Sequence, residues 1–359
     1  MYSLKKFFLS FTAHQIIFGA SLFFSNICLS QTAFFSSKIA FTETQLEKFN
    51  SAFTLSGNHV IFNANDYTTY NYNKQTGEQL WLFITNRKSN NPPYVYGENV
   101  ITAIYEDEVF KSAILPLLPG KSSRTLPMGP LLSVPVFKGD IMYGTALHEG
   151  GKLFAYDLKQ NKMIWEQFVA HGVETQPYFL KDKIVANAEG DNWFDMDYSG
   201  KFLQTGCYSK AQLFVENIKC VRNFKFLTHD DRDITESFLE KYFGADAEVK
   251  EKHTDTKTFL TDGNLLVILG NDKKILKQIE LSQIAPPEGD PTRYKIIKIE
   301  NEKIWLLGNT FLNVYDHKAD VLIKQYDLGK WNPHHVIIDD KKIWLVSKKD
   351  GQLYGLHAD

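Results

Sequence analysis

The sequence predicts an all-β protein that folds as a single closed β-propeller of four-stranded blades. Three observations support this fold class. The apolar runs beyond residue 50 are short and rich in β-branched and aromatic residues, a polar turn closes almost every run, and segments repeat with a period near forty residues. Dense strands and tight turns are typical of sandwiches, barrels and propellers. The period favours the propeller, because about forty residues hold the four short strands of one blade.

The apolar runs follow turns that contain Gly, Asp, Asn or Lys. Three examples are His59–Phe62 after Ser56–Asn58, Leu265–Leu269 after Asp262–Asn264, and Lys342–Val346 after Asp339–Lys341. We interpret each run as a strand and each turn as a hairpin connection.

A repeated segment gives the period. Gly151–Asp157 (GKLFAYD) aligns without gaps to Gly351–His357 (GQLYGLH), 200 residues later, which equals five units of forty. Another copy at Thr69–Asn73 lies 84 residues before the corresponding part of the first, and this offset aligns Trp81 with Trp165. A unit of this length matches a propeller blade, whereas no sandwich requires it.

The longest copy, Gly151–Glu166 (GKLFAYDLKQNKMIWE), resembles a pyrroloquinoline-quinone-binding (PQQ-like) repeat, whose core reads roughly G-x-[LV]-[YF]-A-[LY]-D-x-x-x-G-x-x-x-W. Tyr70–Trp81 is a second good copy. Other copies depart from the pattern, since Lys324 replaces the tryptophan in one and the copy around Trp193–Gly200 lacks it. The resemblance implies a propeller of the non-enzymatic branch, similar to the lipoproteins that assist outer-membrane β-barrel assembly.

The resemblance also implies a structural role for the aromatic residues of the repeat. In such blades the tyrosine and tryptophan pack between neighbouring sheets, and the aspartate and glycine close the turn between the third and fourth strands. We therefore expect packing rather than ligand binding at Tyr72, Trp81, Tyr156 and Trp165, since aromatic burial dominates core energetics.

Seven blades are expected, with eight as the alternative. Their ranges are 54–84, 94–126, 133–169, 175–206, 213–281, 293–328 and 334–358. The fifth is long because a short helix is expected near 234–243, with Thr235 as its N-cap and Gly244 as its stop. Splitting this region would give eight blades. The last range supplies three strands, so a strand near 33–42 is expected to complete it and close the ring.

The first thirty residues predict a secretory signal, which leaves 31–359 as the propeller domain. Lys5 and Lys6 precede an uncharged stretch, and Cys28 and Ser30 supply small side chains before a cut between Ser30 and Gln31. A retained anchor is the alternative, because the uncharged stretch is long enough to span a bilayer. Cleavage is favoured by the small residues that follow. It predicts a periplasmic or extracellular protein with no membrane span after cleavage.

Two cysteines remain after this cut, Cys207 and Cys220. An even pair in an oxidising compartment can form a disulfide. Two buried thiols are the alternative, because free cysteine is often buried.

Charge is nearly balanced, with 40 basic and 42 acidic residues. The chain has no basic block of the kind that nucleic-acid binding requires, so this class of function is excluded. We expect a monomer that binds an envelope protein or a polysaccharide.

Three clusters could hold a metal, but each has a structural explanation. Asp195–Gly200 (DMDYSG) imitates the start of a calcium loop, yet Gly206 stands where the twelfth-position glutamate is required. His229–Asp233 precedes the expected helix, where acidic residues act as caps. His334–His335 lies in a loop that enters a strand. We therefore assign no catalytic, metal or cofactor-binding residue and expect no cofactor.

Propellers generally bind ligands on the face that carries the loops between blades and those between the second and third strands. The residues expected at this binding rim are Asn65, Asp66, His148, Glu149, His171, Glu174, Asp191, Trp193 and Trp331. Polar and aromatic loop residues of this kind suit a binding surface.

The sequence favours an exported, non-enzymatic scaffold. One alternative is a PQQ- and calcium-dependent dehydrogenase, although such enzymes are usually longer and often carry a vicinal Cys-Cys pair that this chain lacks. Another is a propeller-fold glycan hydrolase or lyase, which would need two carboxylates at a separation that sequence does not reveal.

Overall fold

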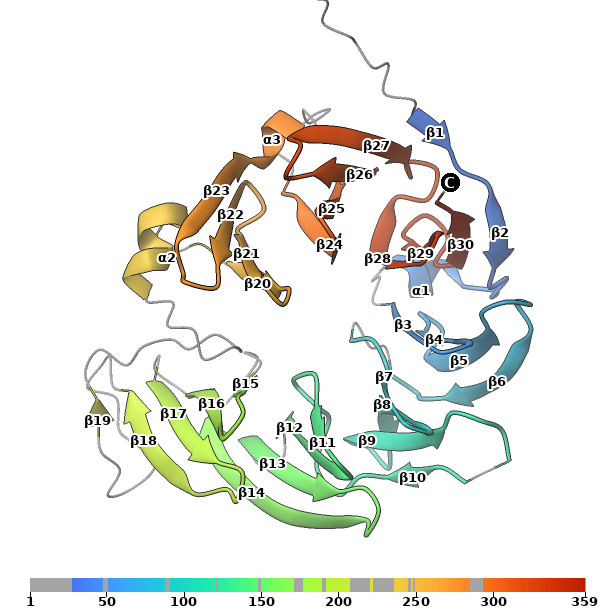
Figure 1. The fold of residues 1–359 in the computed structure, drawn as a ribbon. Coiled ribbons are helices and arrows are strands. Elements are labelled where there is room, and N and C mark those ends of the chain that lie inside the picture. Colours follow the sequence, from blue (N-terminus) through green and yellow to red (C-terminus); the bar gives the residue numbers. More distant parts are fainter. Residues whose placement is uncertain are drawn as a thin grey trace, which may run out of the picture.

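The computed structural model describes residues 28–47, 51–87, 91–120, 122–147, 150–170, 177–188, 192–206, 220–221, 236–244, 247, 249–284 and 293–358. In this part of the chain seven sheets stand around a ring as the blades of a propeller (Figure 1). The predicted all-β class and seven-blade count are confirmed, and the eight-blade alternative is wrong.

The blades follow the chain in order. Blade 1 holds β3 (Ala52–Ser56), β4 (His59–Asn63), β5 (Thr68–Asn73) and β6 (Gln79–Ile84). Blade 2 holds β7 (Tyr94–Tyr96), β8 (Asn99–Glu106), β9 (Val109–Pro116) and β10 (Arg124–Thr125). Blade 3 holds β11 (Val136–Lys138), β12 (Ile141–Leu147), β13 (Gly151–Asp157) and β14 (Lys162–Ala170). Blade 4 holds β15 (Tyr178–Phe179), β16 (Lys183–Ala188), β17 (Asn192–Asp197) and β18 (Phe202–Gly206).

The remaining blades repeat this order. Blade 5 holds β20 (Lys250–His253), β21 (Lys257–Thr261), β22 (Leu265–Gly270) and β23 (Ile275–Glu280). Blade 6 holds β24 (Lys295–Glu300), β25 (Lys303–Gly308), β26 (Phe311–Asp316) and β27 (Val321–Asp327). Blade 7 holds β28 (Pro333–Asp339), β29 (Lys342–Ser347), β30 (Leu353–His357) and, as its outer strand, β2 (Ala33–Ser36). In each blade the first of these strands lies nearest the centre of the ring (Figure 1).

Two blades carry a fifth, parallel strand on their outer edge. β1 (Cys28–Ser30) pairs with β27 of blade 6. β19 (Cys220–Val221) pairs with β18 of blade 4. The second pairing corrects the expected start of the fifth blade, because the strand near Cys220 extends blade 4 and blade 5 begins at Lys250.

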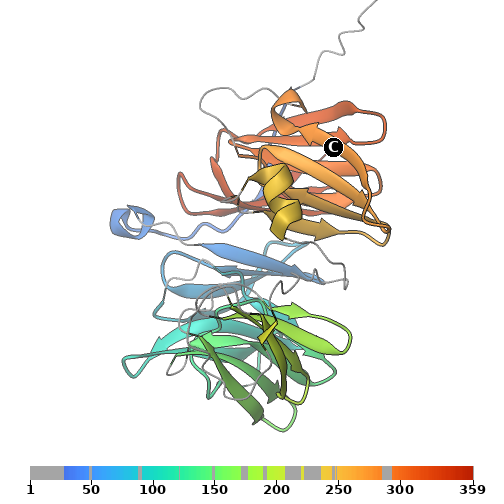
Figure 2. The same cartoon turned by 90° about the vertical axis from the view of Figure 1, so that its left-hand side faces the viewer.

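Three short helices accompany the described sheets: α1 (Glu43–Glu47), α2 (Glu236–Phe243) and α3 (Leu281–Ile284). The expected helix near 234–243 is confirmed as α2. Its Leu239, Tyr242 and Phe243 pack on Leu260 and neighbouring residues, which form the face of blade 5 opposite to that packed on blade 6. α1 follows β2 and stands away from the sheets on one side of the ring (Figure 2).

A β-bulge recurs between the third and fourth strands of five blades. The register shifts at Asn71/Tyr72, Ala155/Tyr156, Asp195/Met196, Ile268/Leu269 and Val314/Tyr315. A bulge places one extra residue on one strand and re-aims the side chains beside it. In three of these blades the residue that follows the extra one on the fourth strand contacts the next blade with its side chain.

This contact joins the outer strand of one blade to the turn after the third strand of the next. Trp81 Nε1 donates to Leu117 O, and Trp165 Nε1 donates to Tyr198 O, both at 3.0 Å. Lys277 Nζ donates to His317 O at the same distance. These side chains therefore serve the packing between blades, as expected for the two tryptophans.

The ring closes between blade 7 and blade 1. Phe53 N donates to His335 Nδ1 at 3.3 Å, and Lys74 Nζ lies 2.7 Å from Asp339 Oδ2. Phe35 of β2 packs against Tyr72 of blade 1 and Trp344 of blade 7. Apolar side chains of both blades thus share one core across the closure.

Candidate functional site

Most residues of the expected binding rim lie outside the described residues. These are His148, Glu149, His171, Glu174 and Asp191. Trp193 lies in β17, and its side chain is also outside the described part. A binding role for these six positions stays a prediction.

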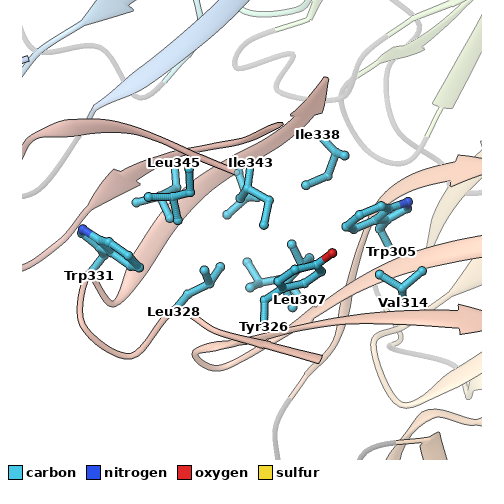
Figure 3. Close-up of a cluster of buried hydrophobic side chains, with 12 residues drawn as sticks. Trp305, Leu307, Val314, Tyr326, Leu328, Trp331, Ile338, Ile343 and Leu345 are labelled. Carbon is cyan, nitrogen blue, oxygen red and sulfur yellow. The ribbon is translucent and has the colours of Figure 1, made fainter. Parts of the chain in front are cut away.

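The other three rim residues are described. Asn65 is fully buried and accepts a hydrogen bond from Ser51 Oγ at 3.0 Å. Trp331 is 3% exposed and lies with Leu328 and Leu345 in the core between blades 6 and 7 (Figure 3). Neither side chain offers surface to a ligand. Asp66 accepts a hydrogen bond from Tyr70 Oη at 2.5 Å, and burial raises the pKa of its carboxyl group.

The calcium-like segment forms the turn between β17 and β18. Asp197 Oδ1 accepts hydrogen bonds from Ser199 N, Ser199 Oγ and Lys201 N at 2.9, 2.6 and 3.0 Å. These bonds lower the pKa of Asp197. Asp195 is buried beside Lys183 Nζ at 3.2 Å. The motif therefore has the structural role of a turn.

His334 and His335 lie inside β28 rather than in the expected loop, and His335 has a structural role. His335 accepts the Phe53 N–H described above, and burial lowers the pKa of His335 to about 4. In the described part of the chain, no three His, Cys, Asp or Glu side chains gather into a metal-binding group.

Several sequence predictions fall outside the described side chains. His229–Asp233 and Cys207 are not described, and Cys220 is described only through the pairing of β19. The disulfide therefore stays a prediction. Ser30 ends β1 and Gln31 follows it, so cleavage between them, which stays a prediction, would remove β1 from the mature protein. Across the described ranges no helix is long and apolar enough to cross a membrane.

Blade 2 presents a small pocket of about 20 Å³ that the sequence did not indicate. Its floor is the face of β8 and β9 that carries Ala103 and Ser112, which are paired across the hairpin. Small side chains in this row leave room between the larger pair Ile101 and Ile114 on one side and Tyr105 and Phe110 on the other. Leu131 and the Asn91–Pro92 segment complete the lining.

Two buried polar groups hold the pocket walls in place. Asn63 Oδ1 accepts hydrogen bonds from Thr69 Oγ1 at 2.6 Å and Thr102 Oγ1 at 3.1 Å, and Asn63 Nδ2 donates to Asn91 O at 3.1 Å. Ser112 Oγ accepts from Leu131 N at 3.1 Å. Because both connecting loops are tied to the sheets, the pocket is formed before any ligand arrives.

The β8–β9 hairpin ends in an exposed aromatic pair above this pocket. Tyr105 and Phe110 lie opposite each other with ring centroids 4.9 Å apart, and they are 36% and 51% exposed. Val109 beside them is 52% exposed. Asp107 and Glu108 close the hairpin with φ values of 51° and 61°, as a two-residue type I′ turn requires.

The hairpin is fixed to the loop that leaves blade 1. Tyr105 N donates to Thr85 O at 2.8 Å, and Thr85 N donates to Tyr67 O at 2.8 Å. From the same loop the Arg87 guanidinium lies 4.4 Å from the centroid of the Phe110 ring. We call Arg87, Tyr105, Val109, Phe110 and the pocket together the blade 2 surface.

The blade 2 surface lies on the predicted face of the propeller, but its residues were not predicted. The connections after β4, β6 and β8 emerge on one face, which carries Asp66, Arg87 and the hairpin tip. A usable signal was present in the sequence YEDEVF, where two aromatic residues flank an acidic turn at a place where strands normally become polar. The contact with Arg87 was not readable from local pattern.

Comparisons with known proteins support the fold alone. No protein-family model and no curated protein matches the chain. Among solved structures, the computationally designed Ika8 protein is 14% identical, with 90% of this chain and 99% of that one covered and a TM-score of 0.57. The C-terminal WD40 domain of Sif2 is 9% identical, with coverage of 84% and 93% and a TM-score of 0.52.

A weaker likeness is to BamB from Moraxella catarrhalis. It is 11% identical, with 85% of this chain and 68% of that one covered, but the TM-score is 0.37. That score carries no argument about function. Because no family model matches, the PQQ-like character of the repeats stays a prediction.

Proposed function

We propose that the protein is an exported, non-enzymatic propeller that binds a protein partner in the cell envelope through the blade 2 surface. The observation that carries this proposal is the exposed aromatic pair Tyr105 and Phe110, held on a hairpin that backbone hydrogen bonds fix to blade 1. The predicted signal segment supports export, and the sequence pattern of the blades supports descent from PQQ-like repeats.

The composition of the surface suits protein recognition. Aromatic residues and arginine are enriched in the energetic centres of protein interfaces. Tyr105 and Phe110 form an exposed apolar pair, and exposed apolar patches mark interaction sites. Because the hairpin is already ordered, a partner would lose little free energy in ordering it.

The size of the pocket argues against a small-molecule ligand. Its space of about 20 Å³ holds roughly one water molecule, far less than small-molecule sites offer. A partner would therefore be held by the exposed aromatic pair rather than by the pocket.

Site-specific photo-crosslinking in the native envelope tests this proposal. A benzophenone amino acid replaces Phe110 in one variant and Leu276 in a matched control. Leu276 is 56% exposed on the outer strand of blade 5, far along the ring from the hairpin. We expect one discrete crosslinked protein from position 110 and none from position 276, with loss of the product when Tyr105 is changed to alanine.

Two outcomes would contradict the proposal. Identical products from both positions would indicate non-specific contact. A product that resists protease but disappears on glycan cleavage would mean that the surface binds a polysaccharide. Export is checked separately by the N-terminal sequence of the mature protein, which should begin at Gln31.

A further inference from the structure

We infer that the partner presents an aspartate or glutamate to Arg87 from an extended segment whose apolar side chains cover Phe110. This inference rests on the proposed function, and it names the chemistry that the blade 2 surface selects. It makes Arg87 the residue that determines specificity.

Arg87 is a cation held in place without an anionic partner. Its guanidinium lies over the Phe110 ring at 4.4 Å, and the residue as a whole is only partly buried. The Nη1 atom is buried and has no hydrogen-bond partner. Burial also lowers the pKa of Arg87, although arginine remains charged in proteins.

Three nearby acidic groups are already engaged, whereas Glu108 of the hairpin turn has no ion pair among the described residues. Glu106 Oε2 and Asp107 Oδ2 lie 3.3 and 3.2 Å from Lys111 Nζ. Asp66 accepts the Tyr70 hydroxyl. Among the residues that the structure describes, no carboxylate forms an ion pair with Arg87.

An unpaired charge in a partly dehydrated position is unfavourable, and an incoming carboxylate relieves it. Arginine binds carboxylates with two parallel hydrogen bonds, which adds orientation to the attraction. Because Arg87 and Phe110 are stacked, a segment that pairs with the guanidinium necessarily places its neighbouring residues on the aromatic pair. The charge therefore selects the segment, and the apolar contacts hold it.

A random twelve-residue peptide library displayed on phage supplies the probe. The full-length protein is the bait, and a Tyr105→Ala/Phe110→Ala double variant removes peptides that bind elsewhere. We expect the recovered peptides to be enriched in Asp and Glu next to apolar residues. Their synthetic copies should bind at least about tenfold more weakly to Arg87→Gln, because an interfacial charge pair is lost.

Two further variants control this measurement. Arg87→Lys keeps the charge but loses the planar pair of donors, so its affinity should lie between those of the wild type and Arg87→Gln. Lys330→Gln removes another cation that lies 5.3 Å from an aromatic ring, in the loop between blades 6 and 7, and should leave affinity unchanged. Circular dichroism and urea midpoints confirm that every variant is folded.

The outcomes separate this inference from the proposed function. Peptides that require Phe110 but lack acidic residues, and bind Arg87→Gln normally, would overturn the inference and leave the proposed function standing. Failure to recover any peptide that distinguishes the wild type from the double variant would overturn both. A dimer in sedimentation experiments that Arg87→Gln abolishes would show that a second copy is the occupant, which also overturns the inference.

Discussion

Blades 1 and 3 reach the next blade through a tryptophan, whereas blade 5 reaches it through a lysine. We call the contact between two neighbouring blades a seam. In all three seams the side chain follows the bulge and donates at 3.0 Å to a carbonyl after the third strand of the next blade. The surroundings differ. Trp165 lies beside Tyr143 and Gly200, while Lys277 also pairs with Asp320 at 2.7 Å.

The comparison shows that tryptophan and lysine can occupy the same position and donate to the same kind of carbonyl in the next blade. The indole adds apolar contact to the hydrogen bond. The lysine adds an ion pair, which salt weakens. The seam between blades 7 and 1 uses a third arrangement, in which the neutral His335 accepts from Phe53. Four experiments test these differences between the contacts.

The largest effect is expected from Trp165→Ala. It removes a half-buried indole together with its bond to Tyr198 O, so the free energy of unfolding should fall by about 3 kcal/mol. Trp165→Phe keeps most of the contact and should cost about 1 kcal/mol. Urea unfolding measures both. If Trp165→Ala lost no more than Trp165→Phe, the apolar contact would not distinguish this seam from the lysine seam.

The next largest effect concerns pH at the closing seam. The pKa of His335 is lowered from 6.5 to about 4 in the folded protein. Between these pH values the unfolded chain binds a proton that the folded protein does not, so stability falls as the pH falls. The loss should reach about 3 kcal/mol near pH 4.

His335→Asn keeps an acceptor for Phe53 N and does not titrate, so this part of the pH dependence should disappear. The exposed His357→Asn serves as control. Urea midpoints between pH 7 and pH 4 provide the measurement. Parallel curves for the wild type and His335→Asn would show that His335 does not couple this seam to pH.

A smaller effect is expected from Gly200→Ala. Gly200 has φ +86°, and a Cβ there would lie 2.7 Å from Trp165. We expect a loss of about 2 kcal/mol from backbone strain and the clash together. Gly120→Ala, at φ +97° with nothing within 4 Å, should lose about 1 kcal/mol from strain alone. Equal losses of stability for the two variants in thermal unfolding would mean that Trp165 moves aside without a loss of free energy.

The smallest effect is expected from Lys277→Met, which keeps the length of the side chain but loses the ammonium group that donates the hydrogen bond. A loss of about 1 kcal/mol should appear at low salt and shrink at 1 M NaCl, because part of it comes from the ion pair. Lys274→Met, which removes a lysine that is 81% exposed, should be neutral. A loss for Lys277→Met that is independent of salt would assign the whole effect to the hydrogen bond with His317 O.

Most of the fold was predictable because a blade is a local unit. The expected first and sixth blades, 54–84 and 293–328, differ from the observed strands by at most two residues at each end. The error came from a non-local pairing. The strand near Cys220 pairs in parallel with the outer strand of blade 4, and no turn or spacing in the sequence predicts this pairing.

Much less of the site was predictable. The binding face of the propeller was anticipated from blade topology. Tyr105 and Phe110 were not, because aromatic residues are also common in the interior of strands. Trp331 was expected at the rim because it lies in a loop between two blades, but its indole is buried in the core between them. The environment of Arg87 depends on Phe110, which stands on another element 23 positions away along the chain.

The pairing of β2 with β30 makes the closure of the ring depend on two segments that are far apart in the sequence. Ser37 and Gln352, which are joined by a hydrogen bond, stand 315 positions apart. During synthesis β2 therefore has no partner until β30 has been made. A chain that ends before Leu353 would leave β2 and the edge of β29 unpaired, and open edges invite aggregation and proteolysis. Blade 7 is therefore complete only in a molecule that carries both β2 and β30.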